Sequence, residues 1–289
     1  MAWPRDEKMT DGLLKSAEKY IRDRYEGVFS DAQMGNHFRS YVGLDLSKEQ
    51  LSQIEEIVGP SRGKRWLDLG CGFGSFVLVS RRAGIEAAGI DIGQYEIDFA
   101  RRRLREEMPE LNPETVYLSG NARATELQSH SYDLATAWNL LEHIVDYKRV
   151  IGEAYRLLKP GGFFIGVAPN YFSFRREAHY QVPWIPLLPR PIARAYLRCL
   201  GRRTDFFQRD IHYVTNWGIL RALKTQGFKL VYPGMARALR PDLIRSLARR
   251  RILGTLHRWH LDTFVEGTVL AVHWNPLKRS VYATARKPE

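Results

Sequence analysis

The hydrophobic positions between residues 60 and 170 fall into short apolar runs that alternate with longer amphipathic stretches. Residues 65–69 form the first run, and residues 75–83 then read as a helix that stops at Gly84, because glycine is typical of helix ends. Short apolar runs that alternate with helices predict a mostly parallel sheet with helices on its faces. The other runs of strand length lie at residues 86–92, 115–118, 132–138 and 163–168.

A glycine-rich turn separates the first predicted strand from the helix that follows it. Gly70, Gly72 and Gly74 alternate in this turn. Glycine accepts positive φ and lacks the Cβ that would keep a ligand away from the backbone. A strand, a glycine turn and a helix N-terminus in this order are typical of a site for a nucleotide-type ligand. The alternative is a tight strand-to-helix turn that binds nothing.

Two polar positions follow predicted strands at the same edge of the sheet. Asp91 ends the second strand, where its carboxylate can accept hydrogen bonds from both hydroxyls of a ribose. Asn121 follows the third strand and can contact the edge of an adenine ring. Together with the glycine turn, these positions predict a site for an adenine nucleoside.

This ordered set of motifs resembles the class I S-adenosylmethionine-dependent methyltransferases. Residues 227–231 and 282–288 are similar to the last two strands of that family. A dinucleotide-dependent dehydrogenase is the main competitor, but its fingerprint has a third glycine where this chain has Ser75. The segments that carry the resemblance are LDLGCGFG (67–74), GIDI (89–92), YDLATAWNLLEHI (132–144) and RLLKPGG (156–162).

The resemblance implies an α/β, Rossmann-like fold with a mostly parallel seven-stranded sheet flanked by helices, and S-adenosyl-L-methionine as the cofactor. The glycine turn and Asp68 would hold the methionine part of the cofactor, Asp91 the ribose, and Asn121 with Ala122 the adenine. The full set of expected cofactor-binding residues is Asp68, Gly70, Cys71, Gly72, Gly74, Asp91, Ile92, Asn121, Ala122 and Asn139.

Three histidines are candidates for a catalytic base. A hydroxyl or amine acceptor must lose a proton during methyl transfer, whereas a carboxylate need not, and histidine is the usual base near neutral pH. His143 ranks first because it follows the fourth strand at the ligand-binding edge of the sheet. His179 and His212 flank a predicted insertion and come next. For each of them the alternative is a structural histidine that caps a loop.

The pair Glu142 and His143 raises the question of a metal ion. In some ubiquinone-pathway O-methyltransferases that resemble this chain, an acidic residue three positions before a Glu-His pair helps to bind a divalent ion. This chain has Asn139 at that position, and its amide is a poorer ligand. We therefore predict no metal site.

The expected domain organisation is an N-terminal helical cap at residues 1–60 and a methyltransferase domain at residues 61–289. The domain would carry a substrate-side insertion at about 171–215 and a basic helical segment at about 235–262. Charge supports this division, since residues 171–262 contain 18 Lys or Arg and 5 Asp or Glu, against 26 and 27 in the rest of the chain. Such a basic region attracts acidic partners.

The insertion is expected to cover the active site and to select the methyl acceptor, because it follows the fifth strand at the ligand-binding edge. Its prolines at positions 183, 186, 189 and 191 exclude a regular helix or a central strand over that stretch. A helix is predicted to follow at residues 192–200.

Composition indicates a cytoplasmic enzyme. The chain has only two cysteines, which argues against a disulfide framework, and no apolar run near the ~20 residues that span a bilayer. The leading hypothesis is methyl transfer to an oxygen of a small molecule, sugar or lipid-linked intermediate, with peripheral contact to an anionic inner membrane surface as an option raised by the basic region. RNA methylation ranks lower, because residues 138–141 read Trp-Asn-Leu-Leu and not the Asn-Pro-Pro-aromatic run that grips a flipped base. A third reading is a cofactor-binding scaffold without catalysis; the oligomeric state is open.

Overall fold

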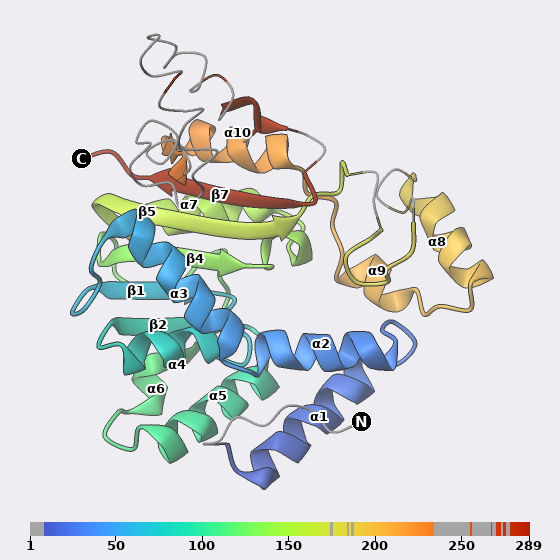
Figure 1. Cartoon of the computed structure of the whole chain (residues 1–289), viewed down its shortest axis with the longest axis horizontal. Helices are drawn as coiled ribbons and strands as arrows, with labels where there is room; N and C mark the ends of the chain where they lie inside the picture. Colours follow the sequence, from blue (N-terminus) through green and yellow to red (C-terminus); the bar gives the residue numbers. More distant parts are fainter. Residues whose placement is uncertain are drawn as a thin grey trace.

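A seven-stranded sheet forms the centre of the computed structural model, which describes residues 9–173, 176–183, 185, 188–233, 255, 267, 270–272, 274–275 and 278–289. The strand order is β3-β2-β1-β4-β5-β7-β6 (Figure 1). Strands β1 to β5 run parallel, and β7 runs antiparallel to both β5 and β6. The predicted α/β, Rossmann-like fold is confirmed. The strands are β1 (Arg65–Leu69), β2 (Glu86–Asp91), β3 (Tyr117–Ser119), β4 (Tyr132–Trp138), β5 (Leu158–Pro169), β6 (Lys229–Val231) and β7 (Ser280–Arg286).

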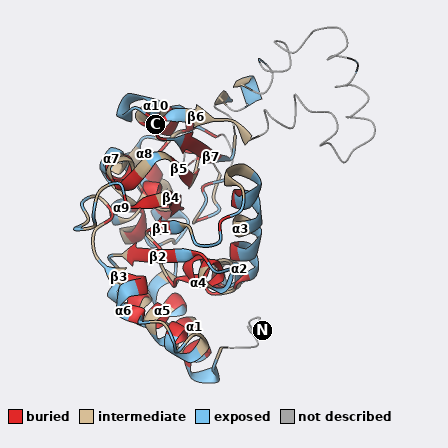
Figure 2. Cartoon of the chain, turned by 90° about the vertical axis from the view of Figure 1, so that its left-hand side faces the viewer, coloured by how far each residue is buried: buried red, intermediate tan, exposed pale blue. Residues whose placement is uncertain are grey.

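Helices cover both faces of the sheet because its strands are apolar on both sides. In β1 the neighbouring residues Trp66 and Leu67 point to opposite faces and join two separate apolar clusters. The Trp66 cluster includes α3 and α4 residues, and the Leu67 cluster includes α7 and α10 residues, so these helix pairs lie on opposite faces (Figure 1). Figure 2 shows buried residues both on the strands and along the helices that pack against them. The helices around the sheet are α3 (Asp45–Val58), α4 (Ser75–Arg82), α5 (Gln94–Glu107), α6 (Pro113–Val116), α7 (Tyr147–Leu157) and α10 (Asn216–Gln226).

Two segments that are far apart in sequence lie together beyond the carboxyl ends of the strands (Figure 1). The first contains α1 (Asp11–Tyr25) and α2 (Asp31–Tyr41). Ser30 caps α2 through a reciprocal pair of hydrogen bonds with Gln33, which fixes where this helix begins. The second segment is the insertion between β5 and α10, with α8 (Arg190–Cys199) and α9 (Asp205–Arg209).

Hydrogen bonds to backbone carbonyls join these two segments into what we call the two-part cover, residues 11–41 and 170–215. Arg202 donates to the carbonyl of Val28 in the N-terminal segment at 2.6 Å, and also to that of Tyr180 within the insertion at 3.2 Å. Arg203 donates to the carbonyl of Glu26 at 3.0 Å. Gln33 on α2 donates to the carbonyl of His179 at 2.9 Å. These hydrogen bonds hold the insertion against the N-terminal helices.

Two sequence-based expectations concern the remaining parts of the chain. The basic helical segment predicted at about 235–262 lies, apart from Thr255, outside the described residues. Cys71 is buried and Cys199 exposed, and neither forms a disulfide with the other. Within the described ranges, no helix combines the length and the apolar character that crossing a bilayer requires.

Candidate active site

The three glycines of the turn after β1 have positive φ, with values of 73° at Gly70, 50° at Gly72 and 76° at Gly74. A Cβ at Gly70 would lie 2.6 Å from the Leu140 side chain, and one at Gly74 would lie 2.5 Å from Tyr117. Neighbouring side chains therefore leave no room for a Cβ at either position. A Cβ at Gly72 would meet nothing within 4 Å, and this residue lines a pocket of about 740 Å³. Gly72 is thus the position where the backbone lies open to a ligand.

Asp91 lies at the end of β2, and its carboxylate is held against this turn. One of its oxygens accepts the backbone N–H of Gly72 at 2.8 Å and the other accepts that of Gly93 at 2.7 Å. A carboxylate has about four acceptor positions, so both oxygens keep capacity for further donors such as hydroxyls. The turn and the carboxylate are positioned together.

Asp68 lies deeper, on β1, and is only 3% exposed. Its carboxylate accepts a hydrogen bond from the Thr136 hydroxyl at 2.7 Å. Burial raises the pKa of Asp68 to about 7, against the opposing effect of the Thr136 hydrogen bond. Asp68, with a pKa raised towards neutral pH, lines the same pocket of about 740 Å³ as Gly72.

Two adjoining pockets hold all the predicted cofactor-binding residues except Gly74. The larger, about 740 Å³, runs from the glycine turn to the two-part cover, and the smaller, about 250 Å³, lies beside the loop after β3. Ile92 lines both, and its side chain is 76% exposed, so it offers an apolar surface between them. Gly74 lines neither pocket, since it packs against Tyr117. The predicted residues in the larger pocket are Asp68, Gly70, Cys71, Gly72, Asp91, Ile92 and Asn139, and those in the smaller are Gly70, Asp91, Ile92, Asn121 and Ala122.

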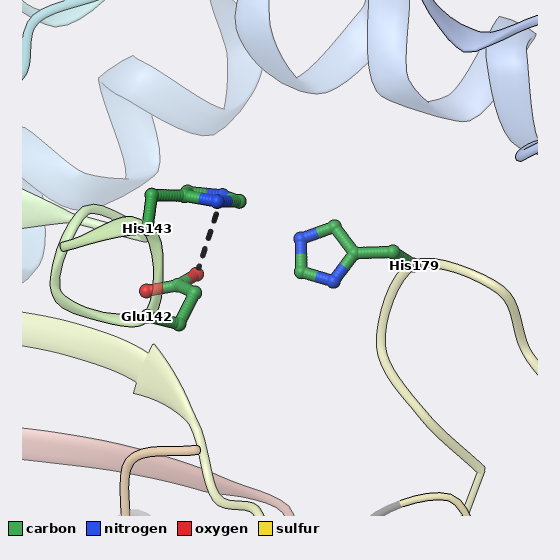
Figure 3. A group of neighbouring side chains, drawn as sticks. All are labelled: Glu142, His143 and His179. Carbon is green, nitrogen blue, oxygen red and sulfur yellow. Dashed lines mark ion pairs between the residues drawn. The ribbon is translucent and has the colours of Figure 1, made fainter. Parts of the chain in front are cut away.

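Two of the three candidate histidines meet in the larger pocket. Glu142 and His143 come from the short helix η1 (Leu141–His143), and His179 comes from the insertion (Figure 3). One nitrogen or oxygen atom from each of the three lies within 4.8 Å of the others. The Nδ1 atom of His143 donates to the carbonyl of Asp210, so its Nε2 atom is the one that faces Glu142, at 4.0 Å. Residues 36 positions apart in sequence thus form one polar cluster.

Glu142 is the buried acid of this cluster. Its side chain is 1% exposed, and its Oε2 atom has no hydrogen-bond partner among the described residues. Burial raises the pKa of Glu142 to about 7, although His179 opposes the shift. Burial also lowers the pKa of His143, and the neighbouring His179 lowers it further. Glu142 therefore offers an unused acceptor oxygen to whatever enters the pocket.

His212 does not join the cluster. It lines the smaller pocket, and its backbone N–H donates to the carbonyl of Glu142 at 2.7 Å. Burial lowers the pKa of His212, and Arg190 adds to the effect. The structure also adds residues that the sequence did not single out: Glu177 behind His179, and Phe206, whose ring lies against both His143 and His179. The only sequence signal for Glu177 is its position two residues before a candidate base.

Comparison with known proteins identifies the family. A family model described as a methyltransferase domain matches residues 67–166. The ubiquinone biosynthesis O-methyltransferase of Shewanella sp. ANA-3 is 31% identical over 180 residues, which cover 59% of this chain and 75% of the relative. The chain belongs to the class I S-adenosylmethionine-dependent methyltransferases. The resemblance that the motifs carry is therefore confirmed.

Other relatives of this methyltransferase match over shorter stretches. The ubiquinone biosynthesis O-methyltransferase of Vibrio cholerae is 35% identical over 128 residues, 43% of this chain and 51% of the relative. The chain thus spans about half the length of that relative. Phosphoethanolamine N-methyltransferase 2 of Haemonchus contortus, solved with S-adenosyl-L-methionine, has a TM-score of 0.55 at 19% identity, over 98% of this chain and 58% of the other. An S-adenosylmethionine-dependent methyltransferase of Mesorhizobium loti has a TM-score of 0.52 at 20% identity, over 85% and 100%. These two structures share the fold.

S-adenosyl-L-methionine, the cofactor of this family, fits the residues of the site. The backbone at Gly72 is open, Asp91 keeps acceptor capacity, and Ile92 presents an apolar side chain between the two pockets. An adenosyl group needs these three properties: room beside the turn, an acceptor for ribose hydroxyls and an apolar surface for the base.

We expect a chelator to leave the activity of this methyltransferase unchanged. Two imidazoles and a carboxylate could hold a divalent cation. We predict no metal because Asn139 stands where the metal-binding enzymes that resemble this chain have an acidic residue. The side-chain amide of Asn139 donates to the Tyr41 hydroxyl at 3.0 Å. Activity measured with and without EDTA checks this prediction. Loss of activity that an added divalent ion restores would contradict it.

Proposed function

We propose that this methyltransferase transfers the methyl group of S-adenosyl-L-methionine to an oxygen atom of a small molecule, a sugar or a lipid-linked intermediate. The observation that supports this most directly is that His143 and His179 line the same 740 Å³ pocket as the glycine turn. A hydroxyl acceptor must lose its proton for this reaction, and imidazoles are suited to accept it near neutral pH.

The chain's own contribution is alignment and proton removal. The bound cofactor supplies an electrophilic methyl group. We assign Asp68, Gly72 and Asp91 to holding it, together with Asn121 and Ala122 at the adenine end. Alignment of the acceptor beside it can contribute roughly 7 to 11 kcal/mol to the lowering of the barrier. We assign the acceptor's proton to one of the three candidate bases, His143, His179 or His212.

The relatives support an oxygen acceptor, because those of Shewanella and Vibrio carry the name ubiquinone biosynthesis O-methyltransferase. The identity of the acceptor does not transfer with that name, since the Vibrio match covers about half of the relative. The insertion lines the acceptor side of the pocket through Ala178, Gln181 and Phe206. Side chains in this insertion are therefore the ones we expect to select the acceptor.

A labelling experiment tests this function. Purified protein is incubated with methyl-labelled cofactor and a bacterial extract separated into lipid, glycan, RNA and small-molecule pools. We expect label in the small-molecule, glycan or lipid pool. Label in the RNA pool alone would contradict the proposal. Absence of label in every pool, with cofactor binding intact by calorimetry, would favour a scaffold role instead.

Helix α8 supports peripheral contact with an anionic membrane surface. Its outer side exposes Ile192, at 54%, and the charged side chains of Arg194 and Arg198, while Leu200 just beyond its end is 47% exposed. An apolar strip beside arginines suits the interface of an anionic bilayer. We expect the protein to float with liposomes that contain an anionic lipid and less with neutral ones. Equal recovery with both would contradict this expectation.

A further inference from the structure

A buried carboxylate lies directly behind His179. The side chain of Glu177 is 0% exposed and accepts four hydrogen bonds within the insertion. The Tyr171 hydroxyl donates to it at 2.7 Å, and the backbone N–H groups of His179 and Tyr180 donate as well. The fourth donor is the Nδ1–H of His179, at 2.8 Å. A carboxylate with this many donors is stabilised in its ionised form despite its burial.

The bond to Glu177 fixes the orientation and the tautomer of His179. With Nδ1 donating to the carboxylate, the neutral ring carries its lone pair on Nε2. No described residue forms a hydrogen bond with Nε2, and the ring points from the insertion towards Glu142 and His143 (Figure 3). His179 therefore presents a free acceptor nitrogen to the pocket.

The other two candidate bases lack such a partner. The Nδ1 atom of His143 is bonded to the neutral carbonyl of Asp210, which does not stabilise an imidazolium as a carboxylate does. His212 lines the smaller pocket, beside the loop after β3, and no carboxylate forms a hydrogen bond with its ring among the described residues. Only His179 combines a carboxylate behind the ring with a free nitrogen in the larger pocket.

We propose that His179 is the catalytic base and that Glu177 and Tyr171 are its positioning residues. This inference rests on the proposed methyl transfer to a hydroxyl. The acceptor O–H bond breaks and its proton goes to Nε2 of His179. The oxygen lone pair forms the new O–CH₃ bond, and the electron pair of the broken C–S bond stays on sulfur. The resulting imidazolium faces Glu177 and releases its proton to solvent after the product leaves.

The charges around His179 agree with this role. Burial alone would lower the pKa of His179, but the Glu177 carboxylate outweighs it, so the pKa lies above the ordinary value of 6.5. The pKa of Glu177 is lowered in turn, because His179 and the other donors outweigh the burial that would raise it. The other titratable groups that act on His179 are Glu142, His143, His37, Asp210 and Tyr171.

The first test needs no acceptor. Imidazole resonances are titrated by ¹⁵N NMR in the wild-type protein and in Glu177→Gln, with Asp205→Asn as the matched acid-to-amide control. Asp205 lies in the same insertion, its side chain is about half exposed, and it pairs with Arg203. We expect His179 to carry its proton on Nδ1 and to titrate above 6.5, and the Glu177→Gln change to lower its pKa by about one unit or more. The Asp205→Asn change should leave the pKa of His179 unchanged.

The second test measures the pH dependence of kcat/KM once an acceptor is in hand. The rate rises with pH as His179 loses its proton, so a lower pKa moves this acid limb to lower pH. We expect Glu177→Gln to move the limb down and to reduce the plateau rate about 10- to 100-fold. Tyr171→Phe removes a donor from Glu177, which strengthens the remaining bond to His179, so the limb should move slightly up. A purely structural role would not move the limb in opposite directions.

Three outcomes would overturn the inference. The first is a pKa of His179 that is the same in the wild-type protein and in Glu177→Gln. The second is a His179 resonance that titrates only after a chelator is added. The third is an acid limb of the kcat/KM profile that neither Glu177→Gln nor Tyr171→Phe moves. If Glu177→Gln does not fold, Tyr171→Phe gives both readouts. Failure of this inference can be distinguished from failure of the proposed function. If Glu177→Gln lowers the pKa of His179 but no acceptor pool takes up label, the pairing of His179 with Glu177 stands and the proposed methyl transfer fails.

Discussion

Replacing Asp91 with alanine is expected to weaken cofactor binding by at least about 100-fold. Hydrogen bonds to a charged group contribute about 1.5 to 3 kcal/mol each, and a ribose offers two hydroxyls to this carboxylate. The substitution also removes the acceptor for the backbone N–H of Gly72, so the turn loses one of its fixed contacts. Calorimetry with S-adenosylhomocysteine measures the loss.

The matched control is Asp98→Ala. Asp98 is exposed on α5, seven positions away, and among the described residues its carboxylate accepts a hydrogen bond only from the nearby Gln94. We expect the Asp98→Ala variant to bind S-adenosylhomocysteine with the affinity of the wild-type protein. An Asp91→Ala variant that is folded and binds with unchanged affinity would show that the cofactor does not contact the end of β2.

Replacing Gly74 with valine is expected to lower the free energy of unfolding by about 3 kcal/mol or more. The new Cβ would lie 2.5 Å from the Tyr117 ring and 2.8 Å from the Ala100 Cβ, both of which are buried. Overpacking typically costs 1 to 3 kcal/mol, and the left-handed backbone at φ 76° adds roughly 1 to 2 kcal/mol for a residue with a side chain. Urea unfolding followed by circular dichroism measures this effect.

Gly72→Ala provides the contrast, because its Cβ meets no protein atom within 4 Å. We expect a stability loss limited to the backbone strain, about 1 to 2 kcal/mol, together with a clear loss of cofactor affinity. If instead Gly72→Ala binds the cofactor as the wild-type protein does, the open side of the turn does not receive the ligand.

The sequence predicts most of the strands and the glycine turn, because both depend on short-range patterns. The strand expected at 115–118 is wrong in its first half, since helix α6 (Pro113–Val116) occupies residues 115 and 116 and β3 begins at Tyr117. The apolar run at 65–69, the alternating glycines and Asp91 are local features, and each lies where it was expected. The role of Gly74 was harder to predict, because packing against Tyr117 is a contact across 43 positions. Close contact with a ligand and close packing against another side chain both require glycine at position 74, so the sequence does not distinguish them.

The acceptor side could be predicted only in part. His143 and His179 are both candidates, but their meeting depends on where the segment between β5 and His179 leads the chain, and that segment has neither the helix nor the strand period. The buried carboxylate of Glu177 was not foreseen, since an isolated glutamate in such a loop is usually solvated. Its burial follows from Tyr171 and the two backbone N–H groups that surround it.

The hydrogen bonds that close the two-part cover carry a consequence for how its substrate preference can diverge. Arg202, Arg203 and Gln33 all donate across the cover to main-chain oxygens, at Val28, Glu26 and His179. Main-chain oxygens are the same whichever amino acid supplies them. Glu26 is exposed, so selection or an engineer can exchange its side chain, and with it the character of this edge of the cover, while the bond from Arg203 stays intact. Val28 is buried and His179 is the base we propose, so the same freedom does not extend to those two positions.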